Sequence, residues 1–537
     1  MLPQAERYDD LVRAFRWRIP ARFNMGVACV DAHADGSGKP ALVFVEETGG
    51  VATYSFDQLK ALTNRFANAL LGNGLARGDR VAVFLPQAPE TAIAHLAAFK
   101  AGLISVPLFT LFGDEALSYR LAAAGAKALV TDLAGLAKLS RVRDQIPDLT
   151  HVFVIGPDRG AGDTLSFDQA LAAASDSFQP VDTGPDDPAI IIFTSGTTGN
   201  PKGALHGHRV LLGHLPCVQF VHQGMPMPGD LHWTPADWAW IGGLFDVLFP
   251  TLYLGVPVLA HRAKKFDPDA AMALMADHQV RNVFLPPTAL KLLRQADVRH
   301  PGLKLRSLLT GGETLGAELG AFVQERLGVE AREIYGQTEC NLVVGSNSSF
   351  FPIRPGSMGK AIPGHDVRIV DEEGQEVPPG QEGHIGVRKG DPVMMLEYWN
   401  NSAATEDKYV GEFLLTGDLG RQDEDGYLWY VSRSDDVITS AGYRIGPGEI
   451  EDCILKHPAV AMVGVVGVPD PVRTEAIKAW VVLKPGVAGS DALVAEIQDQ
   501  VRTRLSGHEY PRYVSFTDAL PMTATGKILR RELRRLG

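Results

Sequence analysis

Residues 189–203 read AIIIFTSGTTGNPKG, a pattern from which a strand and a turn can be predicted. The apolar run at 189–193 predicts a buried strand, and a turn rich in glycine and hydroxyl groups follows directly. Backbone N–H groups at Gly196 and Gly199, the neighbouring hydroxyls and the Lys202 ammonium together form a cradle for an anion such as phosphate. The turn is not a Walker A loop, because Pro201 stands where that motif has the glycine of its GK pair. We therefore predict a strand and turn that bind phosphate.

Outside this stretch, short apolar runs alternate with segments of helical periodicity. Ser55 and Gln58 predict a capping box at the start of a helix that ends near Gly72, and a second helix is expected from Pro89. Such alternation predicts an α/β fold in which helices cover parallel strands. Further buried strands are expected at 80–85, 127–132, 151–156, 281–285 and 305–310.

The composition is that of a folded, enzyme-sized globular protein, with 537 residues of which 45% are hydrophobic and 21% charged. It excludes a wholly disordered chain and a fibrous protein. The formal net charge of −12 disfavours general binding to nucleic acids or anionic membranes, so neither partner is expected. The four cysteines show no CxxC spacing, which argues against a zinc scaffold or a disulfide framework.

One apolar segment, residues 238–260, has the length of a membrane span. Asp246 in its middle and the two prolines, Pro250 and Pro257, oppose insertion, so we predict that it is buried core. The first ten residues, MLPQAERYDD, lack the apolar segment of a signal peptide. We therefore expect a cytoplasmic protein.

The chain changes character after Tyr430. Residues 432–436, SRSDD, are short, polar and charged, as in a linker between rigid bodies. Beyond them the patterns predict a helix at 447–457, strands at 459–468 and 475–483, and a helix at 490–505. The sequence thus predicts a large N-terminal multi-layer α/β portion, 1–431, and a smaller mobile α+β C-terminal domain, 432–537, with its hinge at about 432–436.

The phosphate turn TSGTTGNPKG resembles the signature of the acyl-adenylate-forming superfamily, and further motifs of that superfamily follow in its order along nearly the whole chain. They resemble its adenine-contacting turn (Gly311, Gly312, Glu313), its YGxTE motif (Tyr335, Gly336, Gln337, Thr338, Glu339), its ribose-binding TGD (Thr416, Gly417, Asp418), its hinge RxDD (Arg433, Asp435, Asp436) and its C-terminal adenylation lysine (Lys527).

The resemblance implies that a carboxylate, ATP and CoA become acyl-CoA, AMP and pyrophosphate through a bound acyl-adenylate. It implies Glu339 as an oxygen ligand for Mg²⁺, and Lys527 as a mobile charge for the adenylation transition state. Asp418 and Arg433 would hydrogen-bond the ribose. The implied catalytic residues are Lys202, Thr338, Glu339 and Lys527, and the implied ATP- and AMP-binding residues are Thr194, Ser195, Gly196, Thr197, Thr198, Gly199, Gly311, Gly312, Glu313, Tyr335, Gly336, Gln337, Asp418 and Arg433.

Within the superfamily, SAGYRIGPGEIE at 440–451 resembles the loop of acyl-CoA synthetases that lines the pantetheine tunnel. This segment and PDPVR at 469–473 are similar to those of short- to medium-chain acyl-CoA synthetases. Asp435 would be the hinge that exchanges Lys527 for the Gly442 face between the two half-reactions. The implied CoA-binding residues are Ala441, Gly442, Tyr443, Arg444, Arg473 and Arg512.

The resemblance places the acyl pocket at Gly336, Trp238 and Trp240. Acetate-specific relatives read WWQTE where this chain reads YGQTE, so an indole at position 336 would stand across the acyl channel. Glycine at this position implies a pocket deeper than acetate requires. The tryptophans, Trp233 included, are core residues by default, but their segment walls the acyl pocket in relatives.

Alternative functions stay open at this point. One is an adenylate-forming enzyme that passes the acyl group to another acceptor, such as a carrier protein or an aryl-acid ligase substrate, or that oxidises it as luciferases do. Another is an adenylate-binding sensor without turnover, against which the intact set of charged motif residues argues. His206 and His208 suggest a metal site, but no cysteine or carboxylate is suitably spaced, so structural histidines are expected. Monomer and homo-oligomer both stay open.

Overall fold

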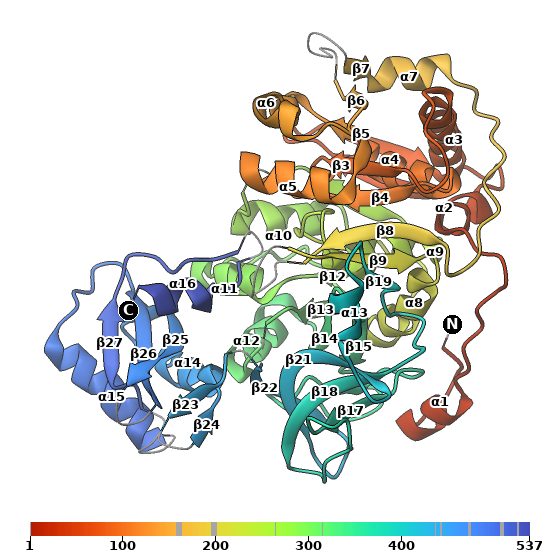
Figure 1. Ribbon diagram of the computed structural model, residues 1–537. Coiled ribbons are helices and arrows are strands. Elements are labelled where there is room, and N and C mark those ends of the chain that lie inside the picture. Colours follow the sequence, from red (N-terminus) through yellow and green to blue (C-terminus); the bar gives the residue numbers. More distant parts are fainter. Residues whose placement is uncertain are drawn as a thin grey trace. The chain divides into compact units, whose positions relative to one another are not determined.

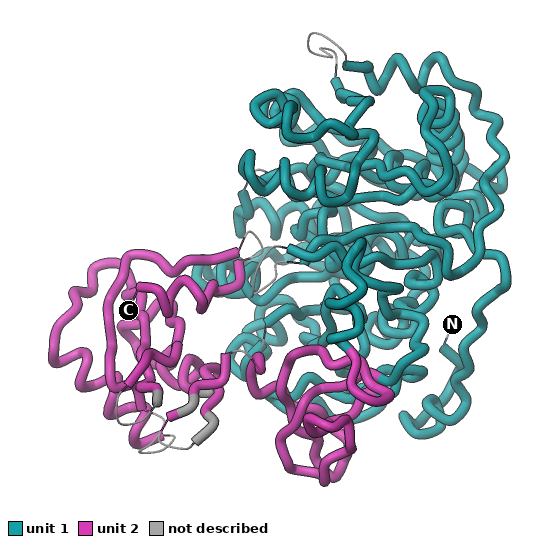
Figure 2. Tube along the Cα trace, in the orientation of Figure 1, with its two compact units in different colours: residues 1–194, 200–366, 388–408 teal, residues 195–199, 367–387, 409–537 magenta. Residues whose placement is uncertain are grey.

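The computed structural model describes residues 2–536 except 157–163, 195–200, 264, 314, 435, 441–442, 471–473, 505–509 and 524–525. The chain forms two compact units (Figure 2). Unit 1 comprises residues 1–194, 200–366 and 388–408, and unit 2 comprises 195–199, 367–387 and 409–537. A large and a small unit were expected, but unit 2 also takes in 367–387 and 409–431, which the sequence assigned to the N-terminal portion. The predicted boundary at 431/432 stays a prediction.

Two sheets with helices packed on them form the framework of unit 1 (Figure 1). The first sheet has the order β19-β9-β8-β4-β3-β5-β6-β7, and antiparallel pairing occurs at β8 with β9 and at β9 with β19. Its strands are β3 Arg80–Phe84, β4 Ile104–Pro107, β5 Ala126–Thr131, β6 His151–Val154, β7 Thr164–Ser166, β8 Pro188–Phe193, β9 Gly203–Gly207 and β19 Glu397–Tyr398.

The second sheet has the order β16-β15-β14-β13-β12-β10-β11-β1-β2. Its middle strands run parallel, while β15, β16 and β2 pair antiparallel with their neighbours. The mixture of parallel strands and helices is the α/β class that the alternating pattern predicted. The strands are β1 Pro40–Val45, β2 Val51–Ser55, β10 His232–Trp233, β11 Val258–His261, β12 Asn282–Phe284, β13 Ser307–Gly311, β14 Ala331–Gln337, β15 Asn341–Gly345 and β16 Lys360–Ala361.

The helices of unit 1 follow the sequence signals. The predicted capping box is confirmed: the Gln58 backbone N–H donates to Ser55 Oγ at 3.1 Å, and the Ser55 N–H donates to Gln58 Oε1 at 2.8 Å. The helices are α1 Tyr8–Ala14, α2 Met25–Cys29, α3 Phe56–Gly72, α4 Pro89–Lys100, α5 Asp114–Ala124, α6 Leu133–Val142, α7 Phe167–Ala173, α8 Val210–Val221, α9 Phe249–Tyr253, α10 Pro268–Asp277, α11 Pro287–Ala296, α12 Ala317–Phe322 and α13 Ser402–Glu406, with π-helices at Gly242–Leu248 and Val323–Leu327.

The apolar segment 238–260 is buried core, as predicted. It forms a π-helix, then α9 and β11, and its Phe245, Phe249 and Leu252 are fully buried. Asp246, the residue that opposed a membrane span, is buried against the imidazole of His214, with Nε2 and Oδ1 2.9 Å apart. Among the described residues, no helix combines the length and apolar character needed to cross a membrane.

Unit 2 holds two small sheets. In one, β17 Val367–Val370, β18 Glu382–Arg388, β21 Phe413–Gln422 and β20 Tyr409–Val410 lie in that order, and β22 Leu428–Arg433 also pairs with β21. In the other the order is β24-β23-β26-β25, with β27 on β26. Its elements are β23 Ile438–Ser440, β24 Tyr443–Ile445, α14 Pro447–Leu455, β25 Val460–Asp470, β26 Thr474–Leu483, α15 Asp491–Arg504, β27 Tyr513–Phe516 and α16 Arg530–Arg535. The helices and strands predicted after residue 446 are thus confirmed.

Candidate functional site

The phosphate turn connects two antiparallel strands. Ser195, Gly196, Thr197, Thr198 and Gly199 lie outside the described residues. On the two sides of the turn, Phe193 of β8 pairs with Gly203 of β9, and the Thr194 backbone N–H donates to the Lys202 carbonyl at 2.9 Å. The hairpin therefore fixes the backbone of Lys202, the one candidate catalytic residue of this turn that the structure describes.

Lys202 and Glu339 come from distant motifs but meet at one tyrosine. The Tyr398 hydroxyl donates to Glu339 Oε1 at 2.5 Å, and Lys202 Nζ lies 5.2 Å from the centroid of the Tyr398 ring. Tyr398 is 3% exposed and Glu339 is 8% exposed. A buried carboxylate next to an ammonium and a phosphate turn can take part in binding a metal–phosphate complex.

The YGQTE motif spans the end of β14 and the turn into β15. The Lys408 ammonium donates to Gln337 Oε1 at 3.3 Å, and the Met395 N–H donates to the Glu339 carbonyl at 2.8 Å. Thr338 and Tyr335 are half-buried. Residues 393–408 thus cover this motif, although nothing in the sequence linked them to it.

Gly336 is a glycine for a reason different from the one predicted. A Cβ at this position would lie 1.5 Å from the Asn341 carbonyl oxygen and 2.9 Å from Leu342 Cα, both backbone atoms of the paired strand β15. A side chain here would therefore meet the hairpin backbone, not an open acyl channel. The argument that Gly336 deepens the acyl pocket by removing a wall needs this correction, because a tryptophan cannot be introduced unless the hairpin backbone moves.

The adenine turn lies beside the YGQTE motif. Gly311 ends β13 and pairs with Ile334 of β14, and a Cβ on Gly311 would lie 2.5 Å from Ile334 Cγ1. Gly312 follows with a φ of 96°, a left-handed conformation that favours glycine. Glu313 pairs with the Lys291 ammonium at 3.0 Å. The two motifs thus end neighbouring parallel strands, which is where α/β folds place ligands.

Unit 2 brings the two ribose candidates together. Asp418 of β21 and Arg433 of β22 are register partners, and Arg433 Nη1 donates to Asp418 Oδ1 at 3.1 Å. Gly417 has a φ of 80°, and the Ser434 N–H donates to its carbonyl at 2.8 Å. Asp418 is buried, so its carboxylate is oriented by the arginine.

Lys527 is exposed at the end of a tight turn. The Thr523 N–H donates to the Lys527 carbonyl at 2.7 Å, and the Lys527 N–H donates to Thr523 Oγ1 at 3.0 Å. Gly526, just before it, has a φ of 84°, which permits the turn. The turn presents the ammonium to solvent and fixes the backbone beneath it.

Helix α16, which follows Lys527, is held by buried ion pairs. Arg530 contacts Glu451 at 2.7 Å and Asp436 at 3.2 Å, and Arg534 contacts Asp436 at 3.0 Å. Burial raises the pKa of Glu451, although the Arg530 guanidinium opposes this effect. Asp436 of the hinge motif is therefore joined to the helix that follows Lys527, while Asp435 lies outside the described residues.

Most of the CoA candidates fall where the structure gives no side-chain contacts. Ala441, Gly442 and Arg473 lie outside the described residues, and Tyr443 and Arg444 are described only as backbone of β24. The Arg512 guanidinium lies over the Tyr510 ring, 4.1 Å from its centroid. The CoA assignments stay predictions.

The three tryptophans of the predicted acyl segment differ in burial. Trp238 is 1% exposed, and Trp233 packs in a core cluster with Leu259 and Val283. Trp240 is half-buried with its ring 6.2 Å from that of Phe284. Beside them, burial raises the pKa of Asp237 to about 7. Of the three indoles, Trp240 has the most surface available to a ligand.

His206 and His208 are both fully buried. The Met25 N–H donates to His208 Nδ1 at 3.1 Å. Burial lowers the pKa of His206 to about 3 and that of His208 to about 4, so both are neutral at physiological pH. Among the described residues, no three His, Cys, Asp or Glu side chains gather as metal ligands would.

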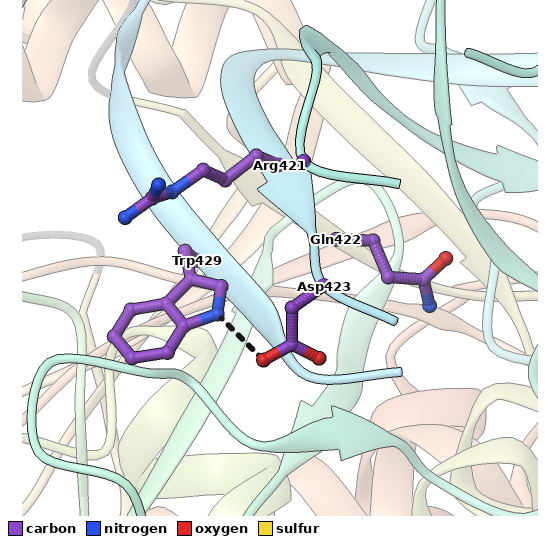
Figure 3. A pocket seen from close by; sticks show the side chains of 5 residues that line it. Arg421, Gln422, Asp423 and Trp429 are labelled. Carbon is purple, nitrogen blue, oxygen red and sulfur yellow. Dashed lines mark hydrogen bonds between the residues drawn. The ribbon is translucent and has the colours of Figure 1, made fainter. Parts of the chain in front are cut away.

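Figure 3 shows a small hollow on the β21–β22 sheet of unit 2. Trp429 Nε1 donates to Asp423 Oδ2 at 3.4 Å, and the Arg421 guanidinium lies 5.5 Å from the centroid of the Trp429 ring. The hollow is lined by Gly380, Arg421, Gln422, Asp423 and Trp429. It contains none of the residues that the sequence motifs predicted.

Sequence reasoning missed Tyr398, Lys408 and Arg530. Each contacts a motif residue from a distant part of the chain: Tyr398 contacts Glu339, Lys408 contacts Gln337, and Arg530 contacts Asp436. The three residues carry no local pattern of their own. The pairing of β19 with β9 reveals Tyr398, the position of α16 reveals Arg530, and the hydrogen bond to Gln337 reveals Lys408.

Known proteins resemble this chain over most of its length. Residues 30–399 match the family model of AMP-binding enzymes, and residues 449–527 match that of the AMP-binding enzyme C-terminal domain. Acyl-coenzyme A synthetase ACSM4, mitochondrial, of Rattus norvegicus is 37% identical over 530 residues, which are 96% of this chain and 91% of that protein.

Solved structures are similar over the same extent. An acyl-CoA synthetase of Brucella canis is 33% identical, with a TM-score of 0.77 and coverage of 99% of both chains. The anthranilate CoA ligase AuaEII, solved in complex with anthranoyl-AMP, is 27% identical, with a TM-score of 0.87 and coverage of 96% of this chain and 98% of that chain.

Proposed function

Since this chain belongs to the family of AMP-binding enzymes, we propose that it joins a carboxylic acid to CoA at the expense of ATP, with AMP and pyrophosphate as products. It is an acid–thiol ligase of the acyl-CoA synthetase type. The observation that carries the proposal is the meeting of Lys202 and Glu339 at Tyr398 beside the phosphate turn. Adenylation brings a carboxylate to a polyphosphate, so its site needs fixed groups that neutralise negative charge.

Different residues of this chain would bind the phosphates, the ribose and the transition state. The hydroxyls and N–H groups of the phosphate turn and the Lys202 ammonium of unit 1 bind the phosphates of ATP. In unit 2, Asp418 accepts hydrogen bonds from the ribose hydroxyls, while Arg433 orients Asp418. Lys527 supplies a positive charge to the pentavalent transition state of adenylation.

Mg²⁺ fits the donor set around Glu339. Magnesium is usually bound through one or two carboxylates and the substrate phosphates, not by an all-protein cage. Glu339 is such a carboxylate, and it lies beside the Lys202 end of the phosphate turn. The ion would neutralise charge on the phosphates as pyrophosphate leaves.

We further propose a short- to medium-chain acid as the substrate. This rests on the likeness of SAGYRIGP and PDPVR to that branch and on the half-buried Trp240, but no longer on Gly336. Each methylene buried in an apolar pocket gains about 0.8 kcal/mol, so kcat/KM should rise with chain length until the pocket is filled.

The test is a pyrophosphate-release screen. The purified protein is given ATP, Mg²⁺ and acids from acetate to decanoate, together with branched and aromatic acids, each with and without CoA. The proposal expects sustained release that depends on CoA, with acyl-CoA as the product. Release that another acceptor sustains equally well without CoA would favour the alternative adenylate-forming enzyme, and no release with any acid would overturn the proposal.

A further inference from the structure

Within unit 1, backbone pairing places Tyr398 beside Lys202 and the YGQTE motif. Tyr398 of β19 is the register partner of Ala204 in β9, which starts directly after Lys202. On either side, the Leu396 N–H donates to the Leu205 carbonyl and the Trp399 N–H to the Gly203 carbonyl, each at 2.7 Å. Segment 396–399 is therefore held against the strand that follows the phosphate turn.

The same segment is also joined to the YGQTE side. The Met395 N–H donates to the Glu339 carbonyl at 2.8 Å, and Asn341 Nδ2 donates to the Val393 carbonyl at 3.1 Å. These main-chain contacts on two sides determine where the Tyr398 ring lies. The position of the Tyr398 ring is therefore set by the backbone of its segment as well as by its own side-chain torsions.

The Tyr398 side chain contacts two groups of opposite charge. Its hydroxyl donates to Glu339 Oε1 at 2.5 Å, and its ring face lies 5.2 Å from Lys202 Nζ, within the range of a cation–π contact. This hydrogen bond uses one lone pair of Oε1 and fixes the plane of the Glu339 carboxylate that would meet a cation. Hydrogen bonds to metal-binding carboxylates orient them, and their loss typically reduces metal affinity or activity about 10- to 100-fold.

We propose that Tyr398 is a positioning residue: its hydroxyl orients the Glu339 carboxylate for the metal ion of bound ATP, and its ring holds the Lys202 ammonium at the phosphate turn. The inference rests on the proposed function, because it assumes that ATP and a divalent ion bind at this site. Tyr398 itself touches neither the acid nor ATP in this scheme. It acts on Glu339 through its hydroxyl and on Lys202 through its ring, and separate substitutions can distinguish these two contacts.

Two substitutions separate the two contacts. Tyr398→Phe removes the hydroxyl and keeps the ring, so it should raise the Mg²⁺ concentration for half-maximal pyrophosphate release about 10- to 100-fold and leave the KM for ATP at saturating Mg²⁺ nearly unchanged. Tyr398→Leu also removes the ring, so it should raise that KM as well. A merely structural tyrosine would lower thermal stability without separating these two constants.

The chain offers a matched control in Tyr8. The Tyr8 side chain is half-buried, and its hydroxyl donates to the Ala361 backbone carbonyl at 2.6 Å, an acceptor that is not a carboxylate. Tyr8→Phe removes a comparable hydrogen bond, and it should leave the metal dependence as in the wild type. The second readout is Mn²⁺ binding to the protein with a non-hydrolysable ATP analogue, followed by electron paramagnetic resonance.

The outcomes are distinct. Weaker Mn²⁺ binding in Tyr398→Phe but not in Tyr8→Phe supports the inference. Equal Mn²⁺ binding and equal Mg²⁺ dependence in all three proteins overturn it, even when the wild type makes acyl-CoA. A wild type that binds Mn²⁺ with the analogue yet makes no acyl-CoA would overturn the proposed function instead, and the Mn²⁺ comparison would still decide the role of Tyr398.

Discussion

Two lysines, Lys202 in unit 1 and Lys527 in unit 2, are held in different ways. Lys202 lies directly before β9 in the β8–β9 hairpin and packs on the ring of the buried Tyr398. Lys527 is exposed on a short turn, and the ion pairs of α16 lie behind it. The backbone of Lys202 cannot move unless hydrogen bonds of the sheet break. The backbone of Lys527 is attached through a turn to the smaller unit 2. Under the proposed function, Lys202 would be a permanent phosphate-binding charge and Lys527 a charge that serves a single half-reaction.

The largest effect should come from Lys527→Ala. Removing this charge should lower ATP-dependent pyrophosphate release by about 1,000-fold or more, because the transition-state charge loses its partner. The same variant, supplied with acyl-AMP and CoA, should make acyl-CoA at nearly the wild-type rate. Rapid-quench assays of both half-reactions provide the measurement, with Arg531→Ala on α16 as the control. If Lys527→Ala lowered the rates of both half-reactions equally, Lys527 would not be specific to adenylation, and it would not differ from Lys202 in this respect.

The next largest effect should be a loss of stability when a glycine is replaced, at Gly336 in unit 1 or at Gly526 in unit 2. Gly336→Ala would place a Cβ 1.5 Å from the Asn341 carbonyl oxygen, so we expect about 4 kcal/mol or more of destabilisation. Gly526→Ala forces an L side chain into a φ of 84°, and this backbone strain should cost about 1–2 kcal/mol. Urea unfolding of both variants measures the difference. Similar losses at the two positions would mean that the β14–β15 hairpin is not packed as described.

Acidification should weaken unit 1. Burial lowers the pKa of His95, His206 and His232 to about 3, far below that of an unfolded histidine. Below about pH 6.5 the unfolded chain therefore binds protons that the folded chain does not, so stability is complete above that pH and is lost as the pH falls towards 3. Each histidine should cost about 1 kcal/mol between pH 7.5 and 5.5.

Glu451 of unit 2 should respond to pH with the opposite sign. Burial raises its pKa, so its contribution to stability is present at low pH and is lost as the pH rises through the folded pKa. Hydrogen exchange resolved by peptide, corrected for intrinsic rates at pH 5.5 and 7.5, should show lost protection in unit 1 and not around Glu451. Uniform loss across both units would contradict this contrast.

The smallest effect should come from Arg530→Gln. This change leaves the buried carboxylates of Asp436 and Glu451 without one of their cations and loosens the helix that follows Lys527. We expect adenylation to slow about 10-fold while the reaction of acyl-AMP with CoA changes little, in line with losses typical of supporting residues. Arg535→Gln is the control, since Arg535 is exposed and pairs only locally with Glu532 at 3.0 Å among its described contacts. If both variants behave alike, the ion pairs do not support Lys527.

Local patterns predicted those parts of the molecule that local physics determines. The Ser55 capping box, the buried strand before the phosphate turn and the elements of residues 447–504 depend on neighbours within a few positions. The contact of Tyr398 with Glu339 depends on strand pairing between residues almost 200 positions apart, and no periodicity encodes it.

Gly336 shows a second limit of sequence reasoning. A glycine in a motif can leave space for a ligand, or it can permit the close approach of another backbone. The sequence alone does not distinguish these two reasons. The structure favours the second reason, because Asn341 of β15 occupies the position of the missing Cβ. The extent of unit 2 was hidden for another reason: segment 367–387 joins it through the pairing of β18 with β21, and no local pattern encodes this pairing.

The pairing of β9 with β19 also has a consequence during synthesis. Gly207 ends β9, and Glu397 begins β19, so the ribosome must add 397 − 207 = 190 residues before the outer strand arrives. At about 5–20 residues per second this takes roughly 10–40 s. Throughout that interval the nascent chain exposes an apolar edge strand that another chain can pair with. We therefore expect chains that stop before residue 397 to aggregate more readily than the full chain.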